Sequence, residues 1–158
     1  MKEKFQEEIF QHQALIHKIC RIYRDTGVER EDLFQDILYQ LWRAYPQFQG
    51  RSKVTTWMYR IGLNTAMATF RKQKIEYSGL QHQQDYADKT NDVDNDRRDQ
   101  LLWAVNQLND ADRAIVTLYL DDLSYQEISE IIGINENYVG VRLNRIKEKI
   151  KELLNIRK

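Results

Sequence analysis

Apolar residues recur three and four positions apart over most of the chain, and no convincing alternation predicts a strand. In the N-terminal half this spacing predicts helices over 5–23, over 31–45 and from Lys53 to about Lys72. Pro46 and Gly50 end the second helix, and Ser52 is placed to cap the third. The expected buried positions are Phe5, Ile9, Leu15, Ile16, Ile19 and Tyr23; then Phe34, Ile37, Leu38, Leu41, Trp42 and Tyr45; then Val54, Trp57, Met58, Ile61 and Ala68.

The stretch 78–96 loses this spacing and is rich in Gln, Asp and Asn, so it cannot bury enough apolar surface to fold. Helical spacing resumes near Arg97, and Asn109 or Asp110 can cap the helix that follows. The sequence therefore predicts an all-α protein of two small helical domains joined by a flexible acidic linker. The expected bounds are 1–76, 77–96 for the linker and 97–158. The apolar positions after the linker are Leu101, Leu102, Val105 and Leu108, then Ile115, Val116, Leu118 and Tyr119.

The C-terminal segment combines a short helix, a glycine turn and a longer basic helix. Ser124 and Glu127 have the spacing of a capping box, Gly133 ends the short helix, and Asn135 can cap the long one. This is the spacing of a helix-turn-helix, whose second helix fits the DNA major groove. A plain helical hairpin is the alternative, with a core or coiled-coil seam made of Val139, Leu143, Ile146, Ile150 and Leu153.

Two features of the long helix favour DNA recognition over the hairpin. Its first residues are polar on the side away from the apolar stripe, where groove contacts begin. Arginine and lysine follow at positions that can face phosphates or guanine edges. The candidate DNA-reading residues are Glu136, Asn137, Tyr138, Arg142, Asn144, Arg145 and Lys149.

Charge is segregated although the formal net charge is zero, with 24 basic and 24 acidic residues. The segment 51–74 holds six basic and no acidic residues, and 142–158 holds seven basic and two acidic ones. Between them, 76–100 holds seven acidic and three basic residues. A neutral chain does not coat nucleic acid indiscriminately. Two positive patches separated by a negative segment indicate two nucleic-acid surfaces.

The run 32–48, followed by 56–66, resembles region two of bacterial sigma factors of the extracytoplasmic-function (ECF) type. The segment 124–149 resembles their region four, and the two resemblances follow the family's order over most of the chain. The resemblance implies association with core RNA polymerase and promoter recognition. In this family, region two recognises the minus-ten element and helps to melt it, and region four recognises the minus-thirty-five element.

The same resemblance implies roles for named residues in region two. A polar helix face would dock on the clamp helices of the polymerase's largest β-type subunit, although a solvated face is the ordinary alternative. Asn64 matches the family position that hydrogen-bonds a flipped minus-ten base, and its amide both donates and accepts. Trp57 fits core packing better than base stacking. The candidate polymerase-binding residues are Asp32, Gln35, Asp36, Gln40 and Arg43, and the minus-ten candidates are Asn64 with Arg60, Arg71, Lys72 and Lys74 for phosphates.

The chain departs from the family's pattern in region four. Gly140 and Val141 occupy positions where relatives often carry a basic and a small polar residue, so base preferences should not be transferred. Readout would then rest on Tyr138, Arg142, Asn144 and Arg145. Ser129 replaces a common Ala, which is tolerated if its hydroxyl bonds back to a carbonyl.

The expected partners are core RNA polymerase, double-stranded promoter DNA, its melted single strand and an anti-sigma factor, since many relatives are held by a membrane-anchored one. No direct membrane insertion is expected, because no apolar run approaches transmembrane length. The N-terminus is too charged for a secretory signal. The single Cys20 excludes an intramolecular disulfide and fits a reducing compartment. These features predict a cytoplasmic protein.

Other classes of function find less support. Asp32 and Asp36 lie one turn apart but have no further carboxylate, and His12, His17 and Cys20 are too few for a zinc site. The segment 50–53 lacks the second glycine of a phosphate loop. We expect no catalytic residue, metal or cofactor. The rival interpretation is a helix-turn-helix regulator whose N-terminal half senses a signal or dimerises, which predicts a homodimer on palindromic DNA.

Overall fold

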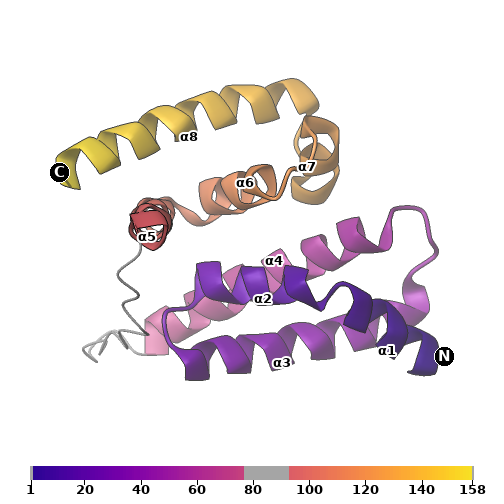
Figure 1. Cartoon of the computed structure of the whole chain (residues 1–158). Helices are drawn as coiled ribbons and strands as arrows, with labels where there is room; N and C mark the ends of the chain where they lie inside the picture. Colours follow the sequence, from indigo (N-terminus) through magenta and orange to yellow (C-terminus); the bar gives the residue numbers. More distant parts are fainter. Residues whose placement is uncertain (1, 77–92, 158) are drawn as a thin grey trace. The chain divides into compact units, whose positions relative to one another are not determined.

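The structure is a computed structural model that describes residues 2–76 and 93–157, with side chains described over 2–68 and 96–155. Every regular element within these ranges is a helix, which confirms the all-α prediction. The chain divides into two compact units, Met1–Asp85 and Tyr86–Lys158, each with its own set of packed helices (Figure 1).

The first unit contains α1 (Lys2–Gln11), α2 (Gln13–Tyr23), α3 (Gly27–Ala44), the short 3₁₀ helix η1 (Tyr45–Gln47) and α4 (Val54–Glu76). Helices α2, α3 and α4 run alongside one another and pack pairwise, so each buries one face against the other two (Figure 1). Their fully buried side chains include Ile16, Ile19, Leu33, Ile37, Leu41, Met58 and Leu63.

Helices α2 and α4 approach closely at Gly62. A Cβ atom placed on Gly62 would lie 2.8 Å from Cδ1 of Ile19, closer than a van der Waals contact. Glycine at this position therefore lets the two helices pack side by side around a buried isoleucine. The same contact brings Gly62 near Ile37 of α3, so the three helices meet there.

The single helix expected over 5–23 is wrong, because the chain breaks at His12 between α1 and α2. His12 has φ −117° and ψ 17°, outside the helical range. The break turns α1 so that Phe5 packs edge-on against the rings of Trp42 and Tyr45, with centroids 5.0 and 5.1 Å away. The apolar spacing could not reveal the break, because both halves keep the same helical phase.

The buried faces of α3 and α4 differ in part from the expected ones. Helix α3 begins at Gly27, capped by Thr26, and buries Leu33, whereas Trp42 is 42% exposed at the edge of the face. Helix α4 begins at Val54, one residue later than expected, and Ala68 on it is exposed. Of the expected residues Met58 is buried, whereas Val54, Trp57 and Ile61 are half-buried. The rest of the buried side is formed by Thr56, Tyr59, Gly62, Leu63 and Ala66, because these positions face α2 and α3.

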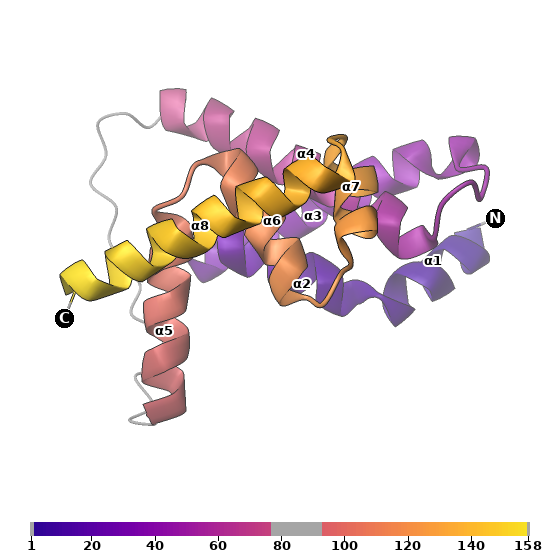
Figure 2. The same ribbon diagram turned by 90° about the horizontal axis from the view of Figure 1, so that it is seen from above.

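The second unit contains α5 (Val93–Asn106), α6 (Asp110–Leu120), α7 (Tyr125–Ile132) and α8 (Glu136–Arg157). Helix α8 packs on all three others and lies across them, as Figure 2 shows. Helix α5 begins four residues before the expected start at Arg97. The rest of the predicted linker lies outside the described residues. The buried side chains of the unit include Ala104, Val105, Leu108, Ile115, Leu118, Ile128, Val139, Leu143 and Ile146.

Two buried arginines, which the sequence pattern did not single out, connect elements within each unit. Arg113 on α6 is 8% exposed, and its Nη2 donates to the carbonyls of Asn106 and Leu108 at 2.9 and 3.3 Å. It therefore satisfies the carbonyl of Asn106, the last residue of α5, and that of Leu108 in the segment that follows. Arg24, 3% exposed, donates to the carbonyl of Ala66 on α4 at 3.3 Å.

Candidate functional site

The helix-turn-helix predicted for the C-terminal unit is formed with its expected caps. The Ser124 Oγ accepts from the Glu127 backbone N–H at 3.1 Å, and the Glu127 carboxylate accepts from the Ser124 N–H at 3.2 Å. Gly133 has φ 85°, a left-handed conformation that glycine adopts without strain. The Asn135 Oδ1 accepts from the Tyr138 N–H at 2.7 Å and begins α8. These local bonds fix the turn and the direction in which α8 leaves it.

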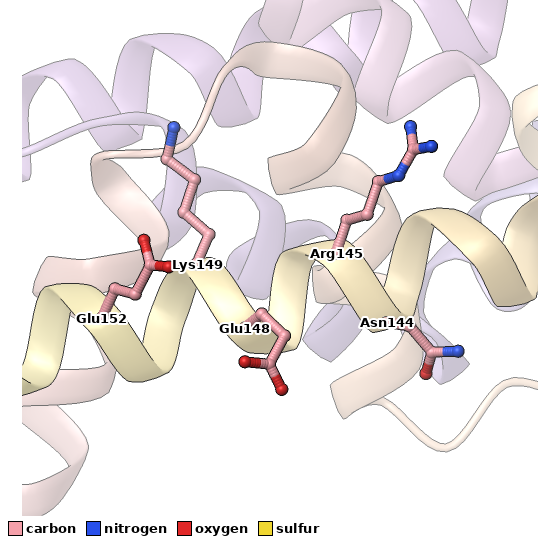
Figure 3. Close-up of a pocket in the computed structure, with 5 residues that line it drawn as sticks. All are labelled: Asn144, Arg145, Glu148, Lys149 and Glu152. Carbon is pink, nitrogen blue, oxygen red and sulfur yellow. The ribbon is translucent and has the colours of Figure 1, made fainter.

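The outer face of α8, opposite its buried stripe, carries most of the predicted minus-thirty-five residues. All of them except Arg142 are exposed. Figure 3 shows Arg145 and Lys149 pointing to one side of the helix, and Asn144 and Glu148 to the other. Together with Glu152 they line a shallow hollow along the helix. The face thus offers amide groups, a phenol and two cations, which suit base edges and phosphates, together with the carboxylates of Glu136, Glu148 and Glu152.

Arg142 differs from the other candidates because α6 holds it. Its guanidinium forms an ion pair with the Asp112 carboxylate, and its Nη1 donates to the Tyr138 hydroxyl at 3.4 Å. Partial burial acts to lower the pKa of Arg142, but the hydrogen bonds with Tyr138 and Asp112 outweigh it and raise the pKa. The side chain is 24% exposed, so Arg142 serves in this structure to orient Tyr138 and tie α8 to α6.

A second cation of α8 also pairs with α6. The Lys147 Nζ lies 4.5 Å from the centroid of the Tyr119 ring, a cation–π distance. A hydrogen bond with Tyr119 raises the pKa of Lys147. The sequence could not separate these two cations from Arg145 and Lys149, since only the three-dimensional packing brings Asp112 and Tyr119 beside α8.

The outer face of α4 carries Arg60 and Asn64, both exposed and one turn apart. Trp57 lies one further turn back but is only half-exposed. Its ring stacks on Phe48 with centroids 4.8 Å apart and an angle of 30°. This stacking agrees with the expected packing role. Arg71, Lys72 and Lys74 lie on the last turns of α4, and their side chains lie outside the described residues.

The polar face of α3 is formed by Asp32, Gln35, Asp36, Gln40 and Arg43, of which Gln40 is half-exposed and the others exposed. Its centre is occupied by Tyr39, which is 60% exposed and which sequence reasoning missed. Tyr39 lies three or four positions from Gln35, Asp36 and Arg43 and so on the same side of the helix. The missed signal was an aromatic residue inside a polar helix face. Such residues are common anchors of protein interfaces.

The residues weighed as metal ligands do not form a site. Cys20 is buried, and His17 stacks on Phe34 with ring centroids 4.5 Å apart. Over the part of the chain that the structure describes, no group of three or more His, Cys, Asp or Glu side chains could hold a metal ion. The helices there are also too short or too polar to span a bilayer.

Comparison with known proteins shows which family both units match. Residues 9–75 match the family model of sigma-70 region 2, and residues 98–150 match that of sigma-70 region 4. The ECF RNA polymerase sigma factor SigW of Bacillus subtilis is 28% identical over 156 residues, which cover 88% of this chain and 82% of SigW. The chain belongs to the ECF sigma factor family. The sigma factor directs RNA polymerase to promoters and initiates transcription.

Other relatives align with nearly the whole length of this chain. The ECF sigma factor SigX of Bacillus subtilis is 26% identical, and the aligned residues cover 94% of this chain and 86% of SigX. In solved structures, the fold matches the sigma factor RpoE in complex with the anti-sigma factor NepR from Bartonella quintana, with a TM-score of 0.74 at 21% identity over 99% of both chains. It also matches CnrH in complex with the cytosolic domain of CnrY, with a TM-score of 0.74 at 17% identity, covering 100% of this chain and 92% of CnrH.

Proposed function

We propose that this sigma factor divides its work among three exposed helix faces. The polar face of α3 binds core RNA polymerase, the outer face of α4 holds the minus-ten element, and the outer face of α8 reads the minus-thirty-five element. The supporting observation is that two separate units, matched in order to regions 2 and 4, each present an outward face of DNA-binding chemistry. The proposed domain bounds are 1–76 and 97–158 with 77–96 as the linker, of which 93–96 already form the first turn of α5.

Run-off transcription tests this proposal as a whole. Purified core polymerase is incubated with a genomic promoter library, with and without the protein. We expect a defined set of transcripts that require the protein and share two sequence elements. A stable homodimer that binds a palindrome without polymerase would instead support the regulator interpretation.

The polymerase-binding role of α3 rests on charge and on Tyr39. A charged and polar face that meets a complementary partner supplies orientation and specificity. The exposed Tyr39 ring at its centre supplies apolar area that a partner can bury. Reversal of both carboxylates, Asp32→Lys with Asp36→Lys, should weaken association with core polymerase by at least tenfold in a pull-down titration.

A matched control for this charge reversal exists in the same unit. Glu3 and Glu7 are exposed on α1, so Glu3→Lys with Glu7→Lys makes the same change in net charge away from the α3 face. Equal weakening by both double variants would show a general effect of charge. It would then exclude the α3 face from a specific role.

The minus-ten role of Asn64 predicts a separation of binding from melting. Asn64→Ala removes the amide from an exposed helical position and keeps good helix propensity, so the fold should persist. We expect promoter opening, measured by permanganate reactivity of unpaired thymines, to fall more than polymerase association. The neighbouring Thr65→Ala is the control, because the Thr65 hydroxyl already donates to the Ile61 carbonyl at 2.7 Å. Equal loss of opening and association would contradict this role.

Three further parts of the proposal follow from the family. The sigma factor works in the cytoplasm, where the polymerase acts. It supplies no catalytic residue, since the polymerase makes the RNA. It is held inactive by an anti-sigma factor, as supported by the fold match to RpoE solved in complex with the anti-sigma factor NepR.

A further inference from the structure

Val141 is an apolar residue exposed at the centre of the outer face of α8. Its side chain is 46% exposed, whereas the apolar residues of the buried stripe, such as Val139 and Leu143, are fully buried. Its neighbours three and four positions away are Asn137, Tyr138, Asn144 and Arg145, all exposed. Val141 is thus surrounded by residues proposed to contact the minus-thirty-five element, and about half of its side chain is open to solvent.

Gly140, which precedes Val141, adds no charged group to the surface. Gly140 has no side chain, and the ring of Tyr125 at the start of α7 lies over it. A Cβ atom on Gly140 would lie 3.4 Å from Cε2 and 3.8 Å from Cδ2 of that ring. Val141 and the Tyr125 ring therefore border one glycine, on the first turns of the helix that enters the groove.

The chemistry of the major groove restricts what such a surface can recognise. Valine has no hydrogen-bonding group, so it cannot satisfy the acceptors of guanine or the amino groups of adenine and cytosine. Thymine alone presents a methyl group on the groove edge, and apolar side chains contact it. A valine placed against any other base leaves polar groups desolvated without a partner.

We propose that Val141 selects thymine at one position of the minus-thirty-five element through the thymine 5-methyl group. The inference rests on the proposed role of α8 in reading this element. Burial of one methyl group predicts about a fourfold contribution to affinity at that position. Asn144 would then read a neighbouring base through hydrogen bonds, and Arg145 would contact a phosphate.

The test uses the full-length protein bound to core polymerase. A promoter is first selected from a library with a randomised minus-thirty-five segment. Each thymine of the selected element is then replaced singly by deoxyuridine, which removes only the methyl group. We expect one position at which the replacement weakens holoenzyme binding about fourfold. In Val141→Ala the same replacement should weaken binding by clearly less than fourfold, because the two γ-methyl groups that would meet the thymine methyl are gone.

A second replacement checks the methyl group in another base. Cytosine at the sensitive position should bind poorly, and 5-methylcytosine should recover part of the affinity with the wild-type protein alone. Asn155→Ala, at an exposed position further along α8, is the control and should keep the deoxyuridine penalty. Because Val141 is exposed and alanine favours helix, Val141→Ala should leave the fold intact.

The outcomes separate this inference from the proposed function. Absence of any methyl-sensitive position, or the same penalty in Val141→Ala as in wild type, would overturn the role of Val141 while leaving the minus-thirty-five role of α8 standing. Holoenzyme that binds without preference for any minus-thirty-five sequence would overturn that role itself.

Discussion

At the scale of single residues, the two glycines of the helix-turn-helix serve different purposes. Gly133 has φ 85° and ends α7, whereas Gly140 lies inside α8 with an ordinary helical backbone. Gly140→Ala places its Cβ in ordinary contact with Tyr125, so it should raise the free energy of unfolding by up to about 1 kcal/mol. Thermal and urea denaturation measure the change.

Gly133→Ala provides the opposite case. Its Cβ would meet open space, but the left-handed backbone should cost about 1 to 2 kcal/mol. If Gly140→Ala destabilised the protein as much as Gly133→Ala, the close contact of Tyr125 with the Gly140 position would be tighter than the structure shows.

Cys20 should be chemically inert in the folded protein. Burial raises the pKa of its thiol from 9.0 to about 11, although the nearby Arg24 and Arg30 act to lower it. The thiol has a higher pKa in the folded protein than in the unfolded chain. The contribution of the buried, neutral thiol to the free energy of unfolding is therefore complete below pH 9 and is lost as the pH rises toward 11. At pH 8 we expect Ellman's reagent to react at least tenfold more slowly with the native protein than in urea. Equal reaction rates in the native protein and in urea would show that the Cys20 thiol is accessible.

At the scale of helices, the packing of α2 on α4 depends on Gly62. Gly62→Ala would place a Cβ 2.8 Å from the Cδ1 of Ile19, which is fully buried. We expect a loss of about 1 to 3 kcal/mol from overpacking. Ile19→Val removes the clashing Cδ1, so the double variant should lose less stability than the two single changes added together. If the stability losses of the two single variants simply added in urea denaturation, the clash with Cδ1 of Ile19 would not be the cause.

The ion pair between Asp112 on α6 and Arg142 on α8 allows a second test of helix packing. Asp112→Asn keeps the size of the side chain and removes the charge that holds Arg142. The pair is partly exposed, so the stability loss should be on the order of 1 kcal/mol. Because Arg142 also bonds the Tyr138 hydroxyl, we expect weaker minus-thirty-five binding by the holoenzyme as well. Retention of full promoter binding would show that Tyr138 needs no such support.

Local signals made the turn chemistry predictable from sequence. Ser124, Glu127, Gly133 and Asn135 act through bonds to residues within four positions, and all lie as expected. The Ser129 hydroxyl also bonds back to the Gln126 carbonyl at 2.8 Å, as anticipated. The expected buried stripe of α8 holds for Val139, Leu143 and Ile146, while Ile150 and Leu153 are only half-buried.

Features that depend on distant contacts were not predictable. The spacing of apolar residues could not show that Arg142 meets Asp112, thirty positions away. It could not place Gly62 against Ile19, nor break the first helix at His12 so that Phe5 reaches Trp42. The candidate faces on α3 and α4 were implied by the family resemblance and that on α8 by its residue types and helix-turn-helix spacing, but Tyr39 and the ion pair of Arg142 required the packed helices.

At the scale of the whole molecule, a chain of zero net charge can still bind DNA because its basic residues are concentrated in two segments. The chain has 24 basic and 24 acidic residues, yet the exposed candidates Arg60 and Arg145 lie in different units. A neutral chain gains little from long-range attraction to DNA. Affinity for a promoter should therefore depend on the polymerase and on both faces engaging one duplex, which raises effective concentration.

Phosphate contacts from both units predict how the promoter affinity of the holoenzyme depends on salt concentration. Each phosphate contact that is removed should lower the slope of log affinity against log salt by about 0.7 for single-stranded and 0.9 for duplex DNA. Arg60→Ala and Arg145→Ala should each lower the slope by about that amount, and the double variant by about the sum. Val141→Ala is the matched control on α8: it should shift affinity equally at every salt concentration, because valine meets no phosphate. Filter binding between 50 and 200 mM salt measures the slopes, and an unchanged slope in either arginine variant would remove that residue from the phosphate contacts.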